Sequence, residues 1–386
     1  MKLDQDAEKI RLLISGHLPP PMGGVATYYQ ALLSSSLSQQ VDLCFVQTSS
    51  QKRALSESGR ATFSNLISAA QDCGRFTRAI WIHRPQVSHI GTAFGLSFVK
   101  HSVCICVARL LGSRVLLHPH CSLAFLYTER PGWWQWLFRR IINMTNGVVA
   151  LSSEWLRLRS IVPTCPVYYL PNAIDLTPYC PIAQERLARG QNNGSLRVLY
   201  LGYLGRAKGT FDLIEAARLA LADGVNLSFD LVGDELTPGE GRLVRQCVDD
   251  ARLNGNVRVH PPAHGAEKLA FFRNADVFVY PSYYEGMPMA VLEAMACGLP
   301  IVATNVGGLP DLVRDRVNGI LVAPRRPAQL AAALQLLASD GPLRQAMQQK
   351  SYQLASEQYD MEKHVAQLVD IYRDDLTCQE LQAARS

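Results

Sequence analysis

The chain has 386 residues, of which 48% are hydrophobic and 18% charged, so it is too long for one ordinary core and too apolar to be disordered. Residues 1–180 carry 17 Lys and Arg against 9 Asp and Glu, whereas residues 181–386 carry 21 against 24. No acidic residue occurs from Cys73 to Thr128. This asymmetry favours an anionic partner for the first half. The sequence contains no zinc-finger or RNP-type pattern and no dense basic stripe, so nucleic acid is the less favoured partner.

Short apolar runs alternate with longer helical stretches, which is typical of α/β proteins with parallel sheets. We expect strands at residues 10–15, 41–47, 87–91, 115–118 and 147–151 of the first half. In the second half we expect them at residues 197–202, 228–233, 257–260, 277–280 and 301–304. The polar segment 181–195 is the best linker. The sequence therefore predicts two doubly wound domains, residues 1–180 and 196–360, and a terminal helix at about 360–386.

Two groups of residues follow predicted strands in the first half. Gly23 and Gly24 open a helical run after the first strand, but G-x-G-x-x-G is absent, which argues against a dinucleotide enzyme. His118 and His120 stand at the end of another strand, and His17 lies beside the first loop. An ordinary strand–helix turn and locally hydrogen-bonded histidines are the structural alternatives.

Residues 131–142 place Trp133, Trp134 and Trp136 beside Arg139 and Arg140. Aromatic side chains with basic neighbours suit a bilayer interface, and a core helix with one wet face is the alternative. The first residues lack the apolar core of a signal peptide, and ten scattered cysteines form no C-x-x-C. We expect a cytoplasmic protein, with an anionic inner membrane surface as one partner.

The segment 201–209, Leu-Gly-Tyr-Leu-Gly-Arg-Ala-Lys-Gly, follows a strand and precedes a helix. Glycines allow the backbone to approach an anion, and Lys208, with Arg206 nearby, supplies positive charge. A cation at a helix start opposes the helix dipole, so a functional role for Lys208 is favoured over a surface lysine.

Residues 280–298 are the most informative stretch. A strand ends at Pro281, Glu285 lies in the following turn, and Met289 to Ala296 are good helix formers stopped by Gly298. Glu293 lies eight positions after Glu285, which at ~1.5 Å per residue is roughly 12 Å along a helix. That separation fits opposite ends of one extended ligand. A helix N-terminus between the carboxylates would seat phosphate, so the pattern predicts a nucleoside diphosphate sugar.

This stretch resembles the E-x7-E motif of the retaining glycosyltransferases of family 4, in its setting of Pro-Ser-x-x-Glu-Gly. The resemblance implies the GT-B fold, two Rossmann-like domains with an interdomain cleft, in which the terminal helix returns to the first domain. It also implies that Glu285 holds the transferred sugar, near the backbone of Gly286 and Met287, and that Glu293 holds the ribose.

Further residues match the family's pattern. The resemblance implies that Lys208 binds the donor diphosphate; the family's arginine position is Tyr203 here, and Arg206 is the substitute. It assigns Gly23, Gly24 and Gly233 to the donor side, His120 to the transferred sugar, and His118 and His17 to the acceptor.

The resemblance implies a retaining hexosyltransferase that acts on a polysaccharide or lipid-linked acceptor at the cytosolic membrane face. A UDP-sugar is the favoured donor and a GDP-sugar the alternative, with no further cofactor. No D-x-D follows a strand, so we expect a metal-free diphosphate site. An epimerase or phosphorylase of the same fold and a non-catalytic sugar-nucleotide-binding protein are the alternatives.

Overall fold

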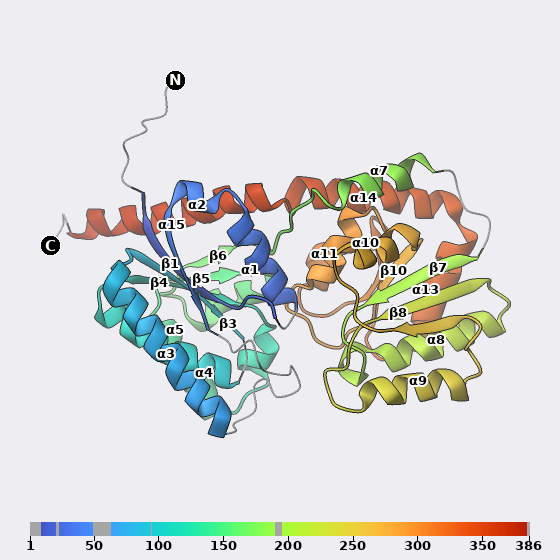
Figure 1. Ribbon diagram of the computed structural model, residues 1–386, viewed down its shortest axis with the longest axis horizontal. Coiled ribbons are helices and arrows are strands. Elements are labelled where there is room, and N and C mark those ends of the chain that lie inside the picture. The colour runs from blue at the N-terminus through green and yellow to red at the C-terminus, as the bar shows by residue number, and fades with distance from the viewer. Residues whose placement is uncertain (1–8, 21–22, 49–62, 94, 190–194, 384–386) are drawn as a thin grey trace. The chain divides into compact units, whose positions relative to one another are not determined.

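The structure is a computed structural model that describes all residues except 1–8, 21–22, 49–62, 94, 190–194 and 384–386. The chain divides into two compact units (Figure 1). The first comprises residues 1–172 and 361–386, and the second comprises residues 173–360. The chain therefore passes between the units twice, once at Asn172 and once at Asp360.

The first unit contains a six-stranded parallel sheet in the order β2-β1-β3-β4-β5-β6. Its strands are β1 (Arg11–Gly16), β2 (Asp42–Gln47), β3 (Val87–Thr92), β4 (Arg114–Pro119), β5 (Gly147–Ala150) and β6 (Val167–Tyr169). Its helices are α1 (Gly24–Ser34), α2 (Leu37–Gln40), α3 (Phe63–His83), α4 (Leu96–Leu110), α5 (Gly132–Ile142), α6 (Leu158–Ile161) and α15 (Met361–Ala383). The connection through α3 leads from β2 across β1 to β3, while α4 leads from β3 to β4 and α5 from β4 to β5. Since all three connections run in the same direction along the sheet, right-handed crossovers place these helices on one face of it.

The second unit also contains a six-stranded parallel sheet, in the order β12-β11-β10-β7-β8-β9. Its strands are β7 (Leu196–Leu201), β8 (Leu227–Val232), β9 (Val257–His260), β10 (Val277–Tyr280), β11 (Ile301–Thr304) and β12 (Gly319–Val322). Its helices are α7 (Cys180–Ala188), α8 (Thr210–Ala222), α9 (Glu240–Asp250), α10 (Gly265–Asn274), α11 (Met289–Ala296), α12 (Leu309–Leu312), α13 (Pro327–Ser339) and α14 (Gly341–Gln358).

The predicted α/β class with two Rossmann-like sheets is confirmed, and all ten predicted strands are present with boundaries shifted by no more than a residue or two. Two further strands, β6 and β12, were not predicted. Both are short edge strands, of three and four residues, and so short an apolar run gives little periodic signal.

The expected linker over residues 181–195 is wrong in its first half, because residues 180–188 form α7 within the second unit. Arg186 fixes this helix. Its buried guanidinium donates hydrogen bonds to the carbonyl oxygens of Cys297, Ala275 and Phe272 at 2.8, 2.5 and 2.6 Å. Arg186 is therefore a buried residue that satisfies carbonyl groups at the ends of α10 and α11, and not part of a solvated connection.

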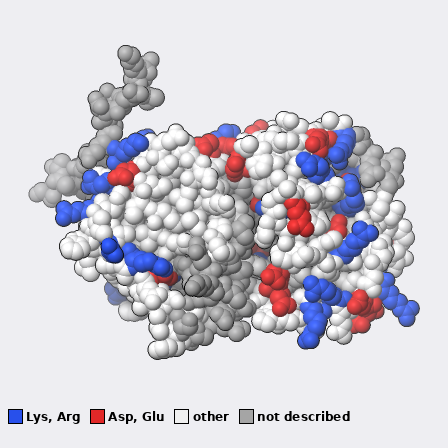
Figure 2. All heavy atoms as spheres, viewed as in Figure 1, with Lys and Arg blue, Asp and Glu red and all other residues white. Residues whose placement is uncertain are grey.

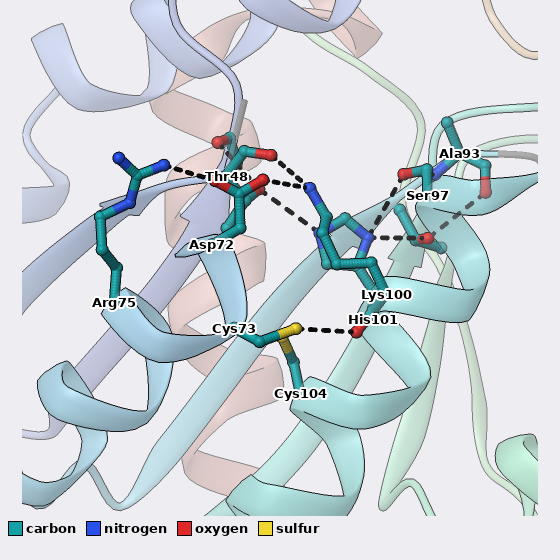
Figure 3. A network of polar contacts seen from close by, with 11 residues as sticks. Thr48, Asp72, Cys73, Arg75, Ala93, Ser97, Lys100, His101 and Cys104 are labelled. Carbon is teal, nitrogen blue, oxygen red and sulfur yellow. Dashed lines mark hydrogen bonds and ion pairs between the residues drawn. The ribbon is translucent and has the colours of Figure 1, made fainter. Parts of the chain in front are cut away.

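A polar network joins α3 and α4 to the carboxyl ends of β2 and β3 (Figure 3). The Lys100 ammonium lies 2.8 Å from the buried Asp72 carboxylate and donates to the carbonyl oxygen of Thr48. His101 Nδ1 lies 3.1 Å from Thr92 Oγ1. This network anchors the inner faces of both helices, since a buried charge is tolerated only when it is paired and hydrogen-bonded.

Among the described residues, no helix has the length and hydropathy needed to span a membrane.

The Lys100–Asp72 pair gives a first prediction. Lys100→Met should lower the free energy of unfolding of the first unit by about 1.5–3 kcal/mol, because the buried Asp72 carboxylate loses a charge-assisted hydrogen bond. Adding Asp72→Asn should cost less than the sum of the two single changes, since the residues share one interaction. Denaturant unfolding followed by tryptophan fluorescence reports on this unit, which contains all five tryptophans.

The exposed Lys350→Met in α14 is the matched control. A loss below 0.5 kcal/mol in Lys100→Met would show that Arg75, which also pairs with Asp72, suffices to hold the carboxylate.

Candidate functional site

The order of the second sheet locates the first candidate site. After β7 the chain continues to β8 and β9 on one side, whereas β10 returns to the other side of β7. The loops that leave the carboxyl ends of β7 and β10 therefore turn in opposite directions. Open α/β sheets bind ligands at such a switch point. The loop after β7 carries Lys208, and the loop after β10 carries Glu285.

Lys208 and Glu285 form an ion pair across this switch point. The distance from Lys208 Nζ to Glu285 Oε1 is 2.5 Å, and both side chains are largely buried. The phenols of Tyr200 and Tyr280 lie near the same carboxylate, and burial together with the Glu285 charge raises the pKa of both. The two tyrosines beside the Lys208–Glu285 pair are thus neutral phenols.

Two glycines permit the backbone contacts that hold the Glu285 loop. Gly209 has φ +69°, and a Cβ there would lie 2.0 Å from the carbonyl oxygen of Pro281. Gly307 has φ +54°, and a Cβ there would lie 1.9 Å from the carbonyl oxygen of Glu285. Because both positions combine a left-handed backbone with contacts closer than any side chain allows, only glycine fits.

Hydrogen bonds complete this packing on both sides of the loop. The N–H of Tyr283 donates to the carbonyl of Ala207 at 3.0 Å, and the N–H of Gly308 donates to the carbonyl of Gly286 at 2.8 Å. The peptide beside Glu285 therefore has a fixed orientation. Met287 is buried next to it.

Glu293 has a separate partner, Lys268 in α10. Lys268 Nζ lies 2.7 Å from Glu293 Oε1, and the Glu293 side chain is 4% exposed. Tyr179 lies against the same carboxylate, so that its burial and the Glu293 charge raise the pKa of the phenol. Sequence reasoning missed Lys268, because a lysine in an unremarkable amphipathic helix gives no signal of its partner 25 residues away.

The predicted helix over Met289–Ala296 is confirmed as α11, with Pro288 as its N-cap and Gly298 (φ +69°) just after its end. Glu285 lies in the loop four residues before the helix. The helical rise assumed between Glu285 and Glu293 thus applies only from Met289 onward. The two carboxylates are nevertheless distinct sites, since each has its own lysine.

In the described part of the chain, Arg206 and Gly233, which are also predicted to bind the donor, form no hydrogen bond or ion pair with Lys208 or Glu285. The exposed Arg206 guanidinium stacks on Phe211, 5.1 Å from the ring centre, so Arg206 and Lys208 contact different groups. Gly233 has φ +158°, and a Cβ there would lie 1.8 Å from the carbonyl oxygen of Gly202.

Glu235 lies in the loop before α9, and its carboxylate reaches the start of that helix. Its carboxylate accepts hydrogen bonds from the N–H groups of Gly239 and Gly241 at 3.0 and 2.8 Å, which lower the pKa of this carboxyl. The protein's own carboxylate therefore already satisfies this helix N-terminus.

In the first unit, the candidate histidines belong to a buried aromatic network. His89 lies between Tyr372 Oη at 2.7 Å and His118 Nδ1 at 3.1 Å. Tyr28 Oη lies 2.9 Å from Nε2 of His364. Since Tyr372 and His364 are on α15, this network fastens the C-terminal helix to the sheet.

His120 lies at the edge of that network, just past the carboxyl end of β4. Its Nε2 lies 3.1 Å from Tyr29 Oη, and its side chain is partly exposed. Tyr29 in turn packs over two strand ends, where a Cβ on Gly91 would lie 1.9 Å from the phenol oxygen and one on Gly16 would lie 2.8 Å from the ring. The sheet therefore leaves room for Tyr29 only because these residues are glycines.

The remaining first-unit candidates differ in exposure. His118 is completely buried, with its ring centre 4.2 Å from that of His120, so the structure makes it a core residue and not a surface ligand. His17 is partly exposed after β1. Gly23 is the N-cap of α1 and Gly24 is its first residue, so the two glycines lie at a helix N-terminus. This helix follows β1, and the strand order of the first sheet reverses between β1 and β3.

Among the described residues, no group of three or more His, Cys, Asp and Glu side chains could hold a metal ion.

The fold defines the class of the protein first. Sucrose-phosphate synthase of Thermosynechococcus elongatus aligns with a TM-score of 0.74 and 20% identity over 95% of this chain and 99% of that one. Alr3699/HepE of Anabaena in complex with UDP aligns with a TM-score of 0.68 and 17% identity over 95% and 100%. These likenesses show the GT-B fold of two Rossmann-like sheets.

Sequence similarity adds the domain family. Residues 182–354, which lie in the second unit, match the family Glycosyl transferases group 1. The D-inositol 3-phosphate glycosyltransferase of Paenarthrobacter aurescens is 34% identical over 181 residues, 46% of this chain and 44% of that protein. The enzyme of the same name from Thermobifida fusca is 33% identical over 211 residues, 53% and 48%. The chain thus spans less than half the length of these curated relatives.

The buried histidines give a second prediction. Burial and neighbouring histidines lower the pKa of His89 to about 3, and burial lowers that of His364 to about 4. In the unfolded chain these groups take up protons near pH 6.5, so the unfolded state binds more protons below that pH. Their contribution to stability is therefore present above pH 6.5 and is lost as the pH falls toward 4.

Each of these histidines should cost the first unit up to about 1.4 kcal/mol per pH unit below pH 6.5. Denaturant unfolding at pH 7, 6 and 5, followed by tryptophan fluorescence, measures the loss. His364→Gln should flatten the pH dependence, and the exposed His264→Gln in the second unit should not. A stability that does not change between pH 7 and 5 would contradict the buried neutral state.

Proposed function

We propose that the protein is a retaining, metal-independent hexosyltransferase that uses a nucleotide-diphosphate sugar as donor. The observation that carries the proposal is the Lys208–Glu285 pair at the switch point of the second sheet, with the Glu293–Lys268 pair on the adjoining helix. One lysine–carboxylate pair for each half of an extended ligand is what a sugar joined to a nucleoside through a diphosphate requires.

Each residue would have a definite role. Lys208, with Arg206 as a second cation, would offset the charge that grows on the departing diphosphate, which is the largest electrostatic demand of the reaction. Glu285 would hold the transferred sugar and keep Lys208 oriented, with the backbone of Gly286 and Met287 beside it. Glu293 would accept hydrogen bonds from the ribose hydroxyls.

No general base is needed in this mechanism. The bond between the anomeric carbon and the diphosphate oxygen breaks while the acceptor oxygen attacks from the same face, and the leaving phosphate oxygen takes the acceptor's proton. Gly23, Gly24, Gly233 and His120 would complete the surroundings of the donor, and His17 would contact the acceptor. His118, being buried, would act only by supporting His120.

The donor base is proposed as uracil, with guanine as the alternative. Anabaena HepE has been solved with UDP and with UDP-glucose, which supports a UDP-sugar for this fold. The acceptor is proposed as a polysaccharide or a lipid-linked saccharide at the cytosolic membrane face. The inositol phosphate in the relatives' names is not carried over, since the match covers about half of this chain.

Three other functions are alternatives for the same fold. A sugar-nucleotide epimerase would convert one nucleotide sugar into another without net release of nucleotide. A phosphorylase would form sugar phosphate from a saccharide and inorganic phosphate, and a non-catalytic binding protein would form no product. Release of nucleotide only when donor and acceptor are both present distinguishes transfer from all three.

A third prediction tests the two glutamates. Glu293→Gln should weaken UDP binding at least 10-fold, because a hydrogen bond to a charged group contributes about 1.5–3 kcal/mol. Glu285→Gln should lower kcat by a similar factor while UDP, which lacks the sugar, binds within about threefold of wild type. Isothermal calorimetry and initial rates measure the two effects, with the exposed Glu267→Gln in α10 as control. Wild-type behaviour of both variants would remove these residues from the site.

A fourth prediction concerns metal ions and Lys208. Activity should persist in excess EDTA, and Lys208→Met should lower kcat/KM by about 100-fold or more, as when a charge-stabilising donor is removed from a transition state. Initial rates with and without EDTA, manganese and magnesium provide the measurement. An enzyme that is inactive in EDTA and restored by a divalent ion, with a mild Lys208→Met effect, would show that a metal holds the diphosphate.

A further inference from the structure

The first unit exposes an unusual number of large hydrophobic side chains on one layer of helices. Of the seventeen large hydrophobic residues that are exposed in the described part of the chain, five lie on α3, three on α4 and two on α5. These are Phe63, Leu66, Ile67, Trp81, Ile82, Val99, Val103, Leu110, Trp133 and Trp136. We call the outer face of these three helices the α3–α5 surface.

The exposed residues form stripes along the helices. On α3, exposed positions 63, 67, 70, 74 and 81 lie on one side and read Phe, Ile, Ala, Gly and Trp, with the exposed Thr77 and Arg78 between the last two. On α4, the exposed positions 99, 103 and 110 read Val, Val and Leu, and the half-buried Cys106 lies on the same side. Residues at intervals of three, four or seven share one side of a helix, so each helix has an apolar side that faces away from the sheet.

The helices do not need these stripes for their own packing. Phe76 and Ile80 fill the inner side of α3, and the polar network of Figure 3 holds α3 to α4. Phe98 of α4 stacks on Phe138 of α5 with ring centres 5.5 Å apart. The three helices are therefore neighbours with complete inner contacts, and their outer hydrophobic residues remain available to another partner.

The tryptophans of α5 divide between the two sides. Trp134 packs against Phe98 with ring centres 5.7 Å apart, and its indole N–H donates to the carbonyl oxygen of Leu126 at 2.8 Å. Trp133 and Trp136 are 66% and 56% exposed. Trp134 therefore supports the helix, whereas Trp133 and Trp136 belong to the α3–α5 surface.

The charges on this surface have one sign. The three helices together contain six Lys and Arg and a single acidic residue, Asp72, which is buried and paired with Lys100. The exposed basic residues are Arg75, Arg78, Arg109, Arg139 and Arg140. In Figure 2, basic side chains interrupt a broad uncharged surface on the first unit and acidic ones are few.

We propose that the α3–α5 surface docks the protein on a bilayer that contains anionic lipids, with the tryptophans inserted at the level of the headgroups. Apolar stripes flanked by arginine and tryptophan match the interfacial zone, where indole rings and basic side chains are both favoured. A second copy of this chain is a poorer occupant, because pairing the surface with itself would oppose two positively charged layers. The proposal deepens the membrane-face part of the proposed function, but it does not depend on the transfer reaction.

Vesicle binding without donor or acceptor tests the proposal, so its outcome is independent of catalysis. The full chain should sediment with phosphatidylcholine vesicles that contain 30% phosphatidylglycerol, less so in 0.5 M salt, and weakly with phosphatidylcholine alone. Brominated lipids should quench its tryptophan fluorescence, since three of the five tryptophans, Trp81, Trp133 and Trp136, are exposed on this surface. Equal binding to both kinds of vesicle, or no quenching, would overturn the proposal.

Two sets of variants separate insertion from charge. Trp81→Ala with Trp133→Ala and Trp136→Ala should lower the partition coefficient at least tenfold without changing circular dichroism. Arg78→Gln with Arg139→Gln and Arg140→Gln should lower it by roughly fivefold per charge, because a basic residue near an anionic surface contributes about 1 kcal/mol. The controls are Leu243→Ala and Arg242→Gln with Arg245→Gln, which remove exposed residues of α9 in the second unit.

The variants show whether the α3–α5 surface binds the vesicles. If the tryptophan variant unfolds, the arginine variant still tests the surface, because its side chains are exposed. Unchanged binding in the arginine variant, or equal loss in the α9 controls, would show that the attraction is not located here. A concentration-dependent dimer that the tryptophan variant abolishes, without vesicle binding by the wild type, would make the surface a self-association interface.

Discussion

The candidate site of the second unit depends on the close approach of three backbone segments at the carboxyl edge of one sheet. Gly209 lies against the carbonyl of Pro281, and Gly307 lies against the carbonyl of Glu285. These contacts are too short for any side chain, and both glycines have a left-handed backbone. Together they hold the Glu285 loop between two neighbouring loops, so the carboxylate meets Lys208 without an entropic cost at the moment of binding.

The two units stabilise polar groups by different means. The candidate site of the second unit uses two largely buried ion pairs, Lys208 with Glu285 and Lys268 with Glu293. The first unit instead buries neutral histidines among tyrosines, and this network joins α15 to the sheet. An ion pair can exchange one partner for a ligand group, which accords with the proposed diphosphate site, whereas a neutral hydrogen-bonded network suits a permanent contact within the fold.

The inner and outer sides of helices α3, α4 and α5 in the first unit differ in what they contact. Its inner side carries the aromatic contacts and the Lys100–Asp72 network, which satisfy packing and buried charge. Its outer side carries hydrophobic stripes and arginines that no contact inside the unit requires. A helix that is apolar on both sides is costly in water, and the cost is removed when the second side meets a partner.

The sequence by itself determined most of the local structure: ten of the twelve strands, the helix over Met289–Ala296, and the approximate place of Lys208, Glu285 and Glu293. Short-range propensity and periodicity are sufficient for such features. Only the tertiary structure decided which residues meet. The sheet order brings Lys208 to Glu285 across 77 positions, Lys268 proves to be the partner of Glu293, and Trp134 separates from Trp133 and Trp136. These outcomes follow from strand order and helix rotation, which join residues far apart in the chain and therefore leave no local pattern in it.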